Sequence, residues 1–227
     1  MNRTTLLRHA ACGLALACAA TAMAAVTGVG EQIAKYRTAP GAPACVKCHG
    51  ATGQGLSAAG FPRLAGMNAD YLVHQLVSFH DGTRVSPVMG PVAKLLTATD
   101  RRAVADYFAA LPVVGTAATA PTPAAASAFA AGATLALRGA WSKGVPACTQ
   151  CHGAGGWGVG ATFPQIAGQS VTYITSQLHA WRLGTRKNDP MGLMHGVALK
   201  LTDADIGNVA TYYASQAATP THRSTKP

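Results

Sequence analysis

The chain has 227 residues, and its 18 Lys and Arg residues against 8 Asp and Glu residues give a formal net charge of +10. This length accommodates about two small domains, and with only 6% aromatic residues each would be short of the bulky side chains that fill a core. The positive charges are dispersed along the chain rather than clustered, which argues against nucleic acid as a partner. They serve either solubility or docking to an acidic protein surface.

The first 24 residues have the pattern of a secretory signal peptide. Arg3 and Arg8 precede a short apolar stretch, and Ala22-Met23-Ala24 is an A-x-A-like cleavage site. The apolar stretch is too short to predict a membrane span. Lipid attachment at Cys18 is an alternative, although the residues before it fit the lipobox pattern poorly. We therefore expect residues 1–24 to be removed on export to the periplasm.

Apolar spacing and capping residues predict helices in both halves of the remaining chain. We expect them at 28–37, 69–80, 97–111, 126–138 and 202–213. Asn68 and Gly82 mark the start and end of the second, while Thr-x-x-Asp at Thr97 and at Thr202 resembles a capping box. No stretch shows sustained strand alternation, so the predicted fold class is all-α.

The pentapeptide Cys-x-x-Cys-His occurs at 45–49 and again at 148–152. It is the attachment sequence of covalent c-type haem, because two thiols about one helical turn apart bond one porphyrin and the histidine ligates its iron. Zinc is the alternative, but paired zinc-binding cysteines lie about 15–20 residues apart, far closer than these two motifs. We predict two covalently bound haem c groups on Cys45, Cys48, Cys148 and Cys151, with proximal iron ligands His49 and His152.

The two motifs lie in halves that resemble each other. Segment 60–66 matches 162–168, the Gly-Thr-Arg turn at 82–84 matches 184–186, and Leu-Thr at 96–97 matches 201–202. Duplication of one domain follows from this repeat. We expect domain 1 at 25–112, an Ala/Pro-rich linker at 113–125, and domain 2 at 126–227 with a loose C-terminal tail, each domain wrapped around one haem that completes its core.

Met89 and Met194 are the candidate distal iron ligands. Both stand seven residues before a Leu-Thr helix start, and thioether sulfur is a soft ligand that raises a haem's reduction potential. Methionine more often fills gaps in a core, but the other methionines do not recur between the halves. His195, next to Met194, is an alternative ligand in the second half, and it has no counterpart in the first.

Two further pairs of residues recur beside these motifs. The carbonyls of Pro62 and Pro164 could accept a hydrogen bond from the proximal histidine ring, or the prolines could simply form turns. Arg84 and Arg186 are candidate partners for haem propionates, because Arg makes strong charge-assisted bonds to carboxylates.

Taken together, these motifs resemble the dihaem class I cytochromes c of the cytochrome c4 family, across nearly the whole mature sequence. The resemblance rests on Pro-Ala-Cys-x-x-Cys-His-Gly, Phe-Pro-x-Leu/Ile-Ala-Gly, Gly-Thr-Arg, and Met before Leu-Thr; the stretch 186–191 is also similar, whereas the first half departs from it at 85–87. It implies two tandem class I cytochrome c domains, haems facing a pseudo-twofold interface, and His/Met ligation of both irons.

We therefore expect an electron-transfer protein rather than an enzyme, because an iron with both axial positions filled by protein has no open site for substrate. The expected partners are redox proteins: a quinol-oxidising cytochrome complex or a periplasmic dehydrogenase as donor, and a haem-copper oxidase as acceptor. Loose association with the inner membrane is a further expectation. The alternative is the cytochrome subunit of, or itself, a haem enzyme such as a periplasmic dehydrogenase or peroxidase, which would need a displaceable distal ligand such as His195 in place of Met194.

Overall fold

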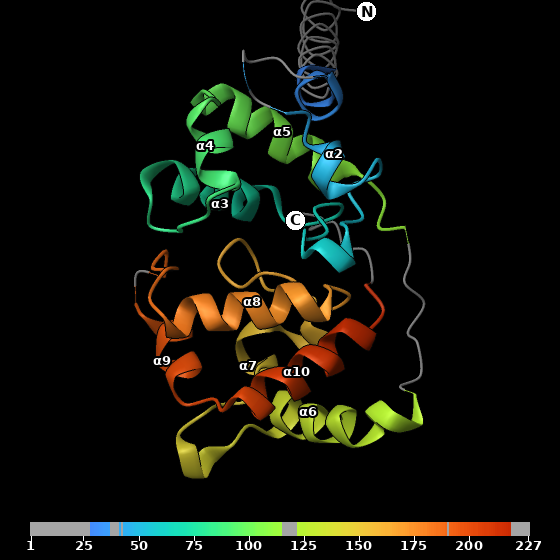
Figure 1. Cartoon of the computed structure of the whole chain (residues 1–227), viewed down its shortest axis with the longest axis vertical. Coiled ribbons are helices and arrows are strands. Elements are labelled where there is room, and N and C mark those ends of the chain that lie inside the picture. The colour runs from blue at the N-terminus through green and yellow to red at the C-terminus, as the bar shows by residue number, and fades with distance from the viewer. Residues whose placement is uncertain (1–27, 37–40, 42, 115–121, 190, 219–227) are drawn as a thin grey trace, which may run out of the picture.

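The computed structural model describes residues 28–36, 41, 43–114, 122–189 and 191–218 (Figure 1). Helices dominate this part of the chain, and its only β pairing consists of isolated bridges. The all-α fold class is therefore confirmed. The predicted signal peptide, most of the linker and the end of the tail lie outside the described residues. Within the described ranges, no helix combines the length and apolar character needed to cross a membrane.

Each half follows the same order of helices (Figure 1). The first half begins with a helix over 28–36 and continues with α2 (Val46–His49), the 3-10 turn η1 (Ser57–Ala59), α3 (Ala69–Asp81), α4 (Met89–Lys94) and α5 (Ala98–Ala110). The second half contains η2 (Pro123–Ala125), α6 (Ala126–Arg138), η3 (Trp141–Lys143), α7 (Thr149–His152), η4 (Ala154–Gly156), α8 (Val171–Arg182), α9 (Leu193–Leu199) and α10 (Asp203–Ser215).

Capping residues start α3, α5 and α10 where the sequence predicts, whereas α8, which Ser170 caps, was not among the expected helices. The Asn68 side chain accepts the Tyr71 N–H at the start of α3, and Thr97 and Thr202 form complete capping boxes with their Asp partners at the starts of α5 and α10. Each cap satisfies backbone N–H groups that have no partner within the helix. The helix at 126–138 has the predicted bounds, and η2 lies inside the expected linker.

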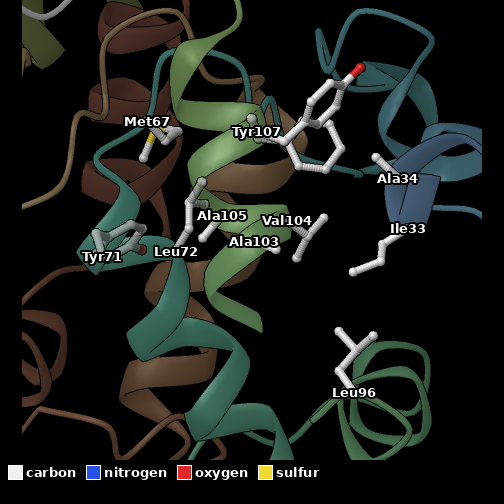
Figure 2. Packing of buried hydrophobic residues seen from close by; sticks show 11 residues of the cluster. Ile33, Ala34, Met67, Tyr71, Leu72, Leu96, Ala103, Val104, Ala105 and Tyr107 are labelled. Atoms are coloured by element: carbon white, nitrogen blue, oxygen red, sulfur yellow. The ribbon is translucent and has the colours of Figure 1, made fainter. Parts of the chain in front are cut away.

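A separate hydrophobic cluster lies in each half. In the first, the 28–36 helix, α3 and α5 converge, and Figure 2 shows Ile33, Leu72 and Val104 contributed by these three elements. In the second, α6, α8 and α10 contribute Leu135, Ile174 and Ile206. Both clusters combine small and medium aliphatic side chains with two or three aromatic rings from the last helix and its neighbours, so much of the chain's small aromatic content is gathered in them.

A glycine sits at the crossing of the first and last helices in both halves. A Cβ atom on Gly30 would collide with the Ala103 carbonyl of α5, and one on Gly132 would collide with the Asn208 carbonyl of α10. Only glycine allows the two backbones to approach this closely. The repeated glycine therefore fixes the same helix crossing in each half.

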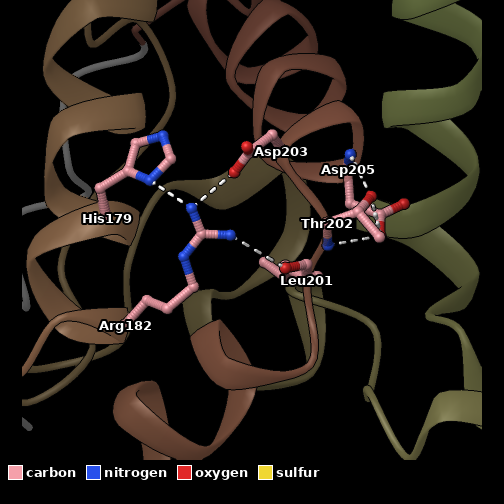
Figure 3. A network of polar contacts seen from close by, with 6 residues as sticks. All are labelled: His179, Arg182, Leu201, Thr202, Asp203 and Asp205. Atoms are coloured by element: carbon pink, nitrogen blue, oxygen red, sulfur yellow. Dashed lines mark hydrogen bonds and ion pairs between the residues drawn. The ribbon is translucent and has the colours of Figure 1, made fainter.

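Polar contacts hold α8 against the start of α10 (Figure 3). Arg182 donates to His179 Nδ1 at 2.7 Å, to Asp203 Oδ1 at 2.5 Å and to the Leu201 carbonyl at 3.4 Å. The Thr202 capping box lies directly beside these bonds. The short helix α9 is therefore held in the loop between two helices whose relative position is fixed.

Substituting Gly132 by Ala should destabilise the second half. The added methyl group would lie inside van der Waals contact of α10, including 2.9 Å from Tyr212 Cβ, and overpacking of this kind costs about 1–3 kcal/mol. The measurement is guanidinium chloride unfolding of the haem-loaded protein. Gly207→Ala in α10 is the matched control, because its Cβ meets open space and helix propensity should stabilise it by roughly 0.5–1 kcal/mol. Equal effects of the two substitutions would contradict the close crossing.

Candidate functional site

One cavity of about 780 Å³ lies between the two hydrophobic clusters and is lined by residues of both halves. Its walls are mainly apolar. All of the predicted site residues line it, which brings together two equivalent sets separated by about a hundred positions in the sequence: Cys45, Cys48, His49 and Met89 from the first half, and Cys148, Cys151, His152 and Met194 from the second.

The two predicted proximal histidines are buried and oriented in the same way. His49 Nδ1 lies 2.9 Å from the Pro62 carbonyl, and His152 Nδ1 lies 2.8 Å from the Pro164 carbonyl. Because a carbonyl oxygen can only accept, Nδ1 must carry the proton in both rings. Burial lowers the pKa of both histidines, so each stays neutral with a free lone pair on Nε2. The prolines therefore do more than form turns, because they fix the tautomer that an iron ligand needs.

The four cysteines lie at the cavity wall, and none forms a disulfide within the described residues. Burial raises the pKa of the Cys45 and Cys148 thiols to about 11. Each pair spans one turn of the short helices α2 and α7, as covalent attachment to one porphyrin requires. In the described part of the chain, no group of three or more His, Cys, Asp or Glu side chains could form a zinc site.

The two predicted distal methionines stand at the starts of two short helices. Met89 opens α4, and its N–H donates to Ser86 Oγ at 3.0 Å. Met194 lies in the first turn of α9, and its N–H donates to Asp189 Oδ2 at 2.5 Å. The same backbone group is therefore held by a neutral hydroxyl in one half and by a carboxylate in the other.

His195, the alternative ligand of the second half, does not line the cavity. Its Nδ1 lies 2.8 Å from the Trp181 carbonyl, which ties the ring to the backbone of α8. Met194 does line the cavity and packs against the second hydrophobic cluster. Met191 is 80% exposed, so it is not placed to act as a ligand.

These residues fit two haem c groups. Each half presents a neutral imidazole, a thioether sulfur and two thiols to the same apolar space, which is the donor set that covalent haem attachment and His/Met ligation use. The apolar walls would bury the porphyrin faces. A bound haem would in turn add apolar bulk to the core of each small domain.

Two buried arginines lie where the halves meet. Arg84 and Arg186 are 6% and 7% exposed, and each guanidinium stacks at 4.5 Å over an aromatic ring of its own half, Phe79 and Trp181 respectively. Their backbones pair in an isolated antiparallel bridge. Stacking on the ring face stabilises each guanidinium and leaves its edge free for hydrogen bonds.

Each of these arginines bonds side chains of the opposite half. Arg84 donates to the Tyr173 hydroxyl at 2.9 Å and to Gln177 Oε1 at 2.5 Å. Arg186 donates to the Tyr71 hydroxyl at 3.2 Å and to Gln75 Oε1 at 3.0 Å. The contacts are reciprocal between repeat-related residues, which is the pattern of a pseudo-twofold axis.

The interface carries positive charge, and within the described residues neither arginine has a carboxylate among its hydrogen-bond partners. Burial, and then the neighbouring charge of Arg84, lowers the pKa of Arg186. Burial alone would raise the pKa of Tyr173, but the charges of Arg84 and Arg186 outweigh it and lower the pKa. A site with positive electrostatic potential favours anions, and the propionates of haem c are carboxylates of the kind that Arg binds.

A second, asymmetric set of hydrogen bonds joins the halves through Arg63, which is 5% exposed and follows Pro62. Its guanidinium donates to the Ala167 carbonyl at 3.1 Å, and its backbone N–H and carbonyl both bond the Gln169 side chain, at 3.0 and 2.9 Å. The corresponding residue of the second half is the neutral Gln165. The buried charge is therefore present in only one half.

Several residues of this interface could not be assigned a role from the sequence. Gln75 and Gln177 recur at equivalent positions, and that repeat was the available signal. Asn188, which donates to Gln75 Oε1 at 2.8 Å and to Ser78 Oγ at 3.1 Å, has no counterpart that would have singled it out. Ser86 and Asp189 were also missed, because their common role is visible only from their bonds to the two methionines.

Comparison with known proteins gives close relatives. The profile of the family described as Cytochrome c matches residues 129–217. A protein named "Thiosulfate dehydrogenase electron acceptor" from Thiomonas intermedia is 50% identical over 182 residues, which are 80% of this chain and 82% of that protein. Cytochrome c4 from Pseudomonas aeruginosa is 37% identical over 174 residues, covering 75% of this chain and 83% of that protein.

Solved structures share the fold. Thiosulfate dehydrogenase (TsdBA) from Marichromatium purpuratum has a TM-score of 0.77 and 42% identity, covering 84% of this chain and 40% of that chain. This chain thus spans less than half of that longer protein. Reduced recombinant cytochrome c4 from Pseudomonas stutzeri has a TM-score of 0.69 and 32% identity, covering 76% of this chain and 93% of that chain.

Replacing Arg186 by Gln should weaken the association of the halves. The substitution removes charge-assisted hydrogen bonds to Tyr71 and Gln75, each worth about 1.5–3 kcal/mol, with part of the loss offset by relief of repulsion from Arg84. Guanidinium chloride unfolding of the haem-loaded protein measures the change. The control is Arg102→Gln, whose exposed ion pairs should contribute about 0–1 kcal/mol. A smaller loss for Arg186→Gln than for Arg102→Gln would contradict the structural role of the buried guanidinium.

Proposed function

The chain belongs to the cytochrome c4 family of dihaem electron-transfer proteins, and we propose that it carries electrons from a periplasmic dehydrogenase towards a terminal oxidase. The observation that carries this proposal is a cavity lined by both complete sets of candidate haem-binding residues. We assign covalent attachment to Cys45, Cys48, Cys148 and Cys151. Iron ligation is assigned to His49 and Met89 in the first half, and to His152 and Met194 in the second.

Haem c, when bound, supplies an iron that alternates between ferric and ferrous states. The residues of this chain would hold the surroundings of the iron unchanged when its charge changes. The Pro62 and Pro164 carbonyls hold both imidazoles in one tautomer, so the ligands need no rearrangement on electron transfer. The apolar walls exclude water, and the paired distal ligands leave no open position for substrate. These properties support a carrier rather than an enzyme.

We divide the chain into the proposed domains 25–112 and 126–227, with the linker at 113–125. Each proposed domain contains one hydrophobic cluster and one set of haem-binding residues, which supports this division. We place the mature chain in the periplasm, with loose attachment to the inner membrane. The signal-like residues 1–24 and the family support export, since c-type haem is attached outside the cytoplasm.

A thiosulfate dehydrogenase is the donor that we favour. A relative named as the electron acceptor of that enzyme is 50% identical to this chain, and the matching region of the longer TsdBA chain lies within a protein named for the same activity. A quinol-oxidising cytochrome complex is the alternative donor, and a haem-copper oxidase is the proposed acceptor. The excess of basic residues would guide the chain to acidic surfaces on these proteins.

The ligand assignment predicts the behaviour of Met89→Ala. Loss of the sulfur should lower the reduction potential of the first centre by on the order of 100 mV and allow carbon monoxide to bind the reduced protein. Redox titration and carbon monoxide difference spectra measure both effects. Met191→Ala is the control, because that side chain is 80% exposed. An unchanged titration of Met89→Ala, with two haems still attached, would show that another residue ligates that iron.

The proposed donor predicts rapid reduction by a thiosulfate dehydrogenase in the presence of thiosulfate. The rate should fall about tenfold or more as ionic strength rises, because screening removes the attraction between oppositely charged surfaces. Stopped-flow absorption at the ferrous haem band follows the reaction, and a mixture without the dehydrogenase gives the background. Reduction by a quinol-oxidising complex but not by the dehydrogenase would favour the alternative donor.

A further inference from the structure

Exposed apolar side chains line the cavity where the loops lead to the candidate distal methionines. Among the large apolar residues that are exposed in the described part of the chain, only Val85, Val88 and Leu193 also line the cavity. Val88, which is 46% exposed, directly precedes Met89. Leu193, which is 48% exposed, directly precedes Met194. The cavity therefore meets the outside of the molecule at an apolar edge beside both candidate ligands.

The two loops form one continuous surface across the boundary between the halves. The antiparallel bridge described above joins their backbones. The Val85 N–H donates to the Thr185 carbonyl at 2.8 Å, and the Lys187 N–H donates to the Thr83 carbonyl at 2.6 Å. We define the methionine-loop surface as these exposed side chains of the two loops: Val85, Val88, Lys187, Met191 and Leu193. A protein that covers this surface contacts both halves at once.

The charge that this surface offers to a partner is positive. Lys187 is exposed and forms no ion pair within the described residues. The nearby carboxylate of Asp81 accepts the N–H and the hydroxyl of Thr83, at 2.9 and 2.7 Å, and Asp189 accepts the Met194 N–H. The net charge of the whole chain is also positive. An apolar face with a basic neighbour is complementary to an apolar patch bordered by carboxylates.

Other occupants fit these features less well. A second copy of the chain, paired symmetrically, would bring the two Lys187 side chains together, and like charges oppose that contact. An anionic lipid surface attracts clusters of Lys and Arg, whereas the methionine-loop surface contains one lysine. Trp141 and Trp157 are exposed elsewhere in the second half, but neither lines the cavity. A partner bound at those residues would not cover the edge of the redox site.

We propose that the methionine-loop surface is the docking face for the thiosulfate dehydrogenase that we favour as donor, which covers it with an apolar patch bordered by carboxylates. This inference rests on the proposed function. Docking here serves the transfer of one electron at a time from the reduced redox group of the enzyme to a ferric centre, with no bond formed or broken. Because the surface belongs to both halves, either centre can receive the electron in one docked position.

The test is stopped-flow reduction of full-length, haem-loaded variants by the dehydrogenase in the presence of thiosulfate. Val85→Asp should lower the second-order rate constant by about tenfold or more, because it removes an apolar contact and repels the carboxylates of the enzyme. Met191→Asp should act in the same direction, and its side chain is 80% exposed, so the fold does not depend on it. Lys187→Glu should also slow the reaction and weaken its dependence on ionic strength.

The matched controls lie on α6, which Figure 1 shows at the end of the second half away from the boundary. Leu137→Asp places the same charge on a side chain that is 54% exposed, and Arg138→Glu changes the net charge as Lys187→Glu does. Neither control residue lines the cavity. Both variants should react within about twofold of the wild type, because salt screens charges away from the contact. Guanidinium chloride unfolding and redox titration of every variant establish that its fold and centres are intact.

The proposal is overturned if Val85→Asp and Met191→Asp react as fast as Leu137→Asp, or if Lys187→Glu reacts as fast as Arg138→Glu. Sedimentation that shows a wild-type dimer and a monomeric Met191→Asp would assign the surface to a second copy instead. Anionic vesicles that retain the wild type but release Met191→Asp would assign it to a lipid surface. If the dehydrogenase does not reduce the wild type, the donor is wrong and the docking proposal falls with it. Rapid reduction of the wild type and of all variants rejects the docking surface alone.

Discussion

The burial of Arg84 and Arg186 between the halves is the constraint on which the arrangement of the site depends. Two like charges shielded from water are costly unless anions or many hydrogen bonds compensate for the lost hydration. Here the guanidiniums stack on aromatic rings and bond neutral oxygens of the opposite half. The described side chains supply no carboxylate to them, which supports the expectation that haem propionates provide the compensating charge. Loading of the cofactor and closure of the interface would then stabilise each other.

The relative orientation of the halves rests on this interface rather than on the connection between them. Backbone bonds cross it from Val85 N–H to the Thr185 carbonyl at 2.8 Å and from Lys187 N–H to the Thr83 carbonyl at 2.6 Å. The tie between Arg63 and Gln169 adds a third contact on another part of the boundary. Three separate ties leave little freedom for one half to rotate against the other. A fixed separation suits electron exchange between two centres, because neither has to diffuse to the other.

Much of this structure follows from local sequence signals. Caps at Asn68, Thr97 and Thr202 set helix starts that depend only on neighbouring residues, and the Cys-x-x-Cys-His motifs carry their chemistry within five positions. The helices α4 and α9 were not predicted, because they are only 6 and 7 residues long and contain glycine. Such short helices are stabilised by packing rather than by propensity. The interface between the halves could not be predicted from neighbouring residues either, since its hydrogen bonds join residues about a hundred positions apart.

The repeat-related halves share their candidate iron ligands but differ in the group that bonds the backbone of the candidate distal methionine. The proline carbonyls, the imidazoles and the crossing glycines are all fixed by close packing, so a change at any of them would disturb the core of its half. The position that bonds the methionine N–H is under a weaker constraint. Ser and Asp both accept backbone N–H groups at the start of a helix, so either satisfies Met89 or Met194 equally well. The group beside the candidate distal ligand can therefore differ between the halves while the helix start and the methionine stay in place.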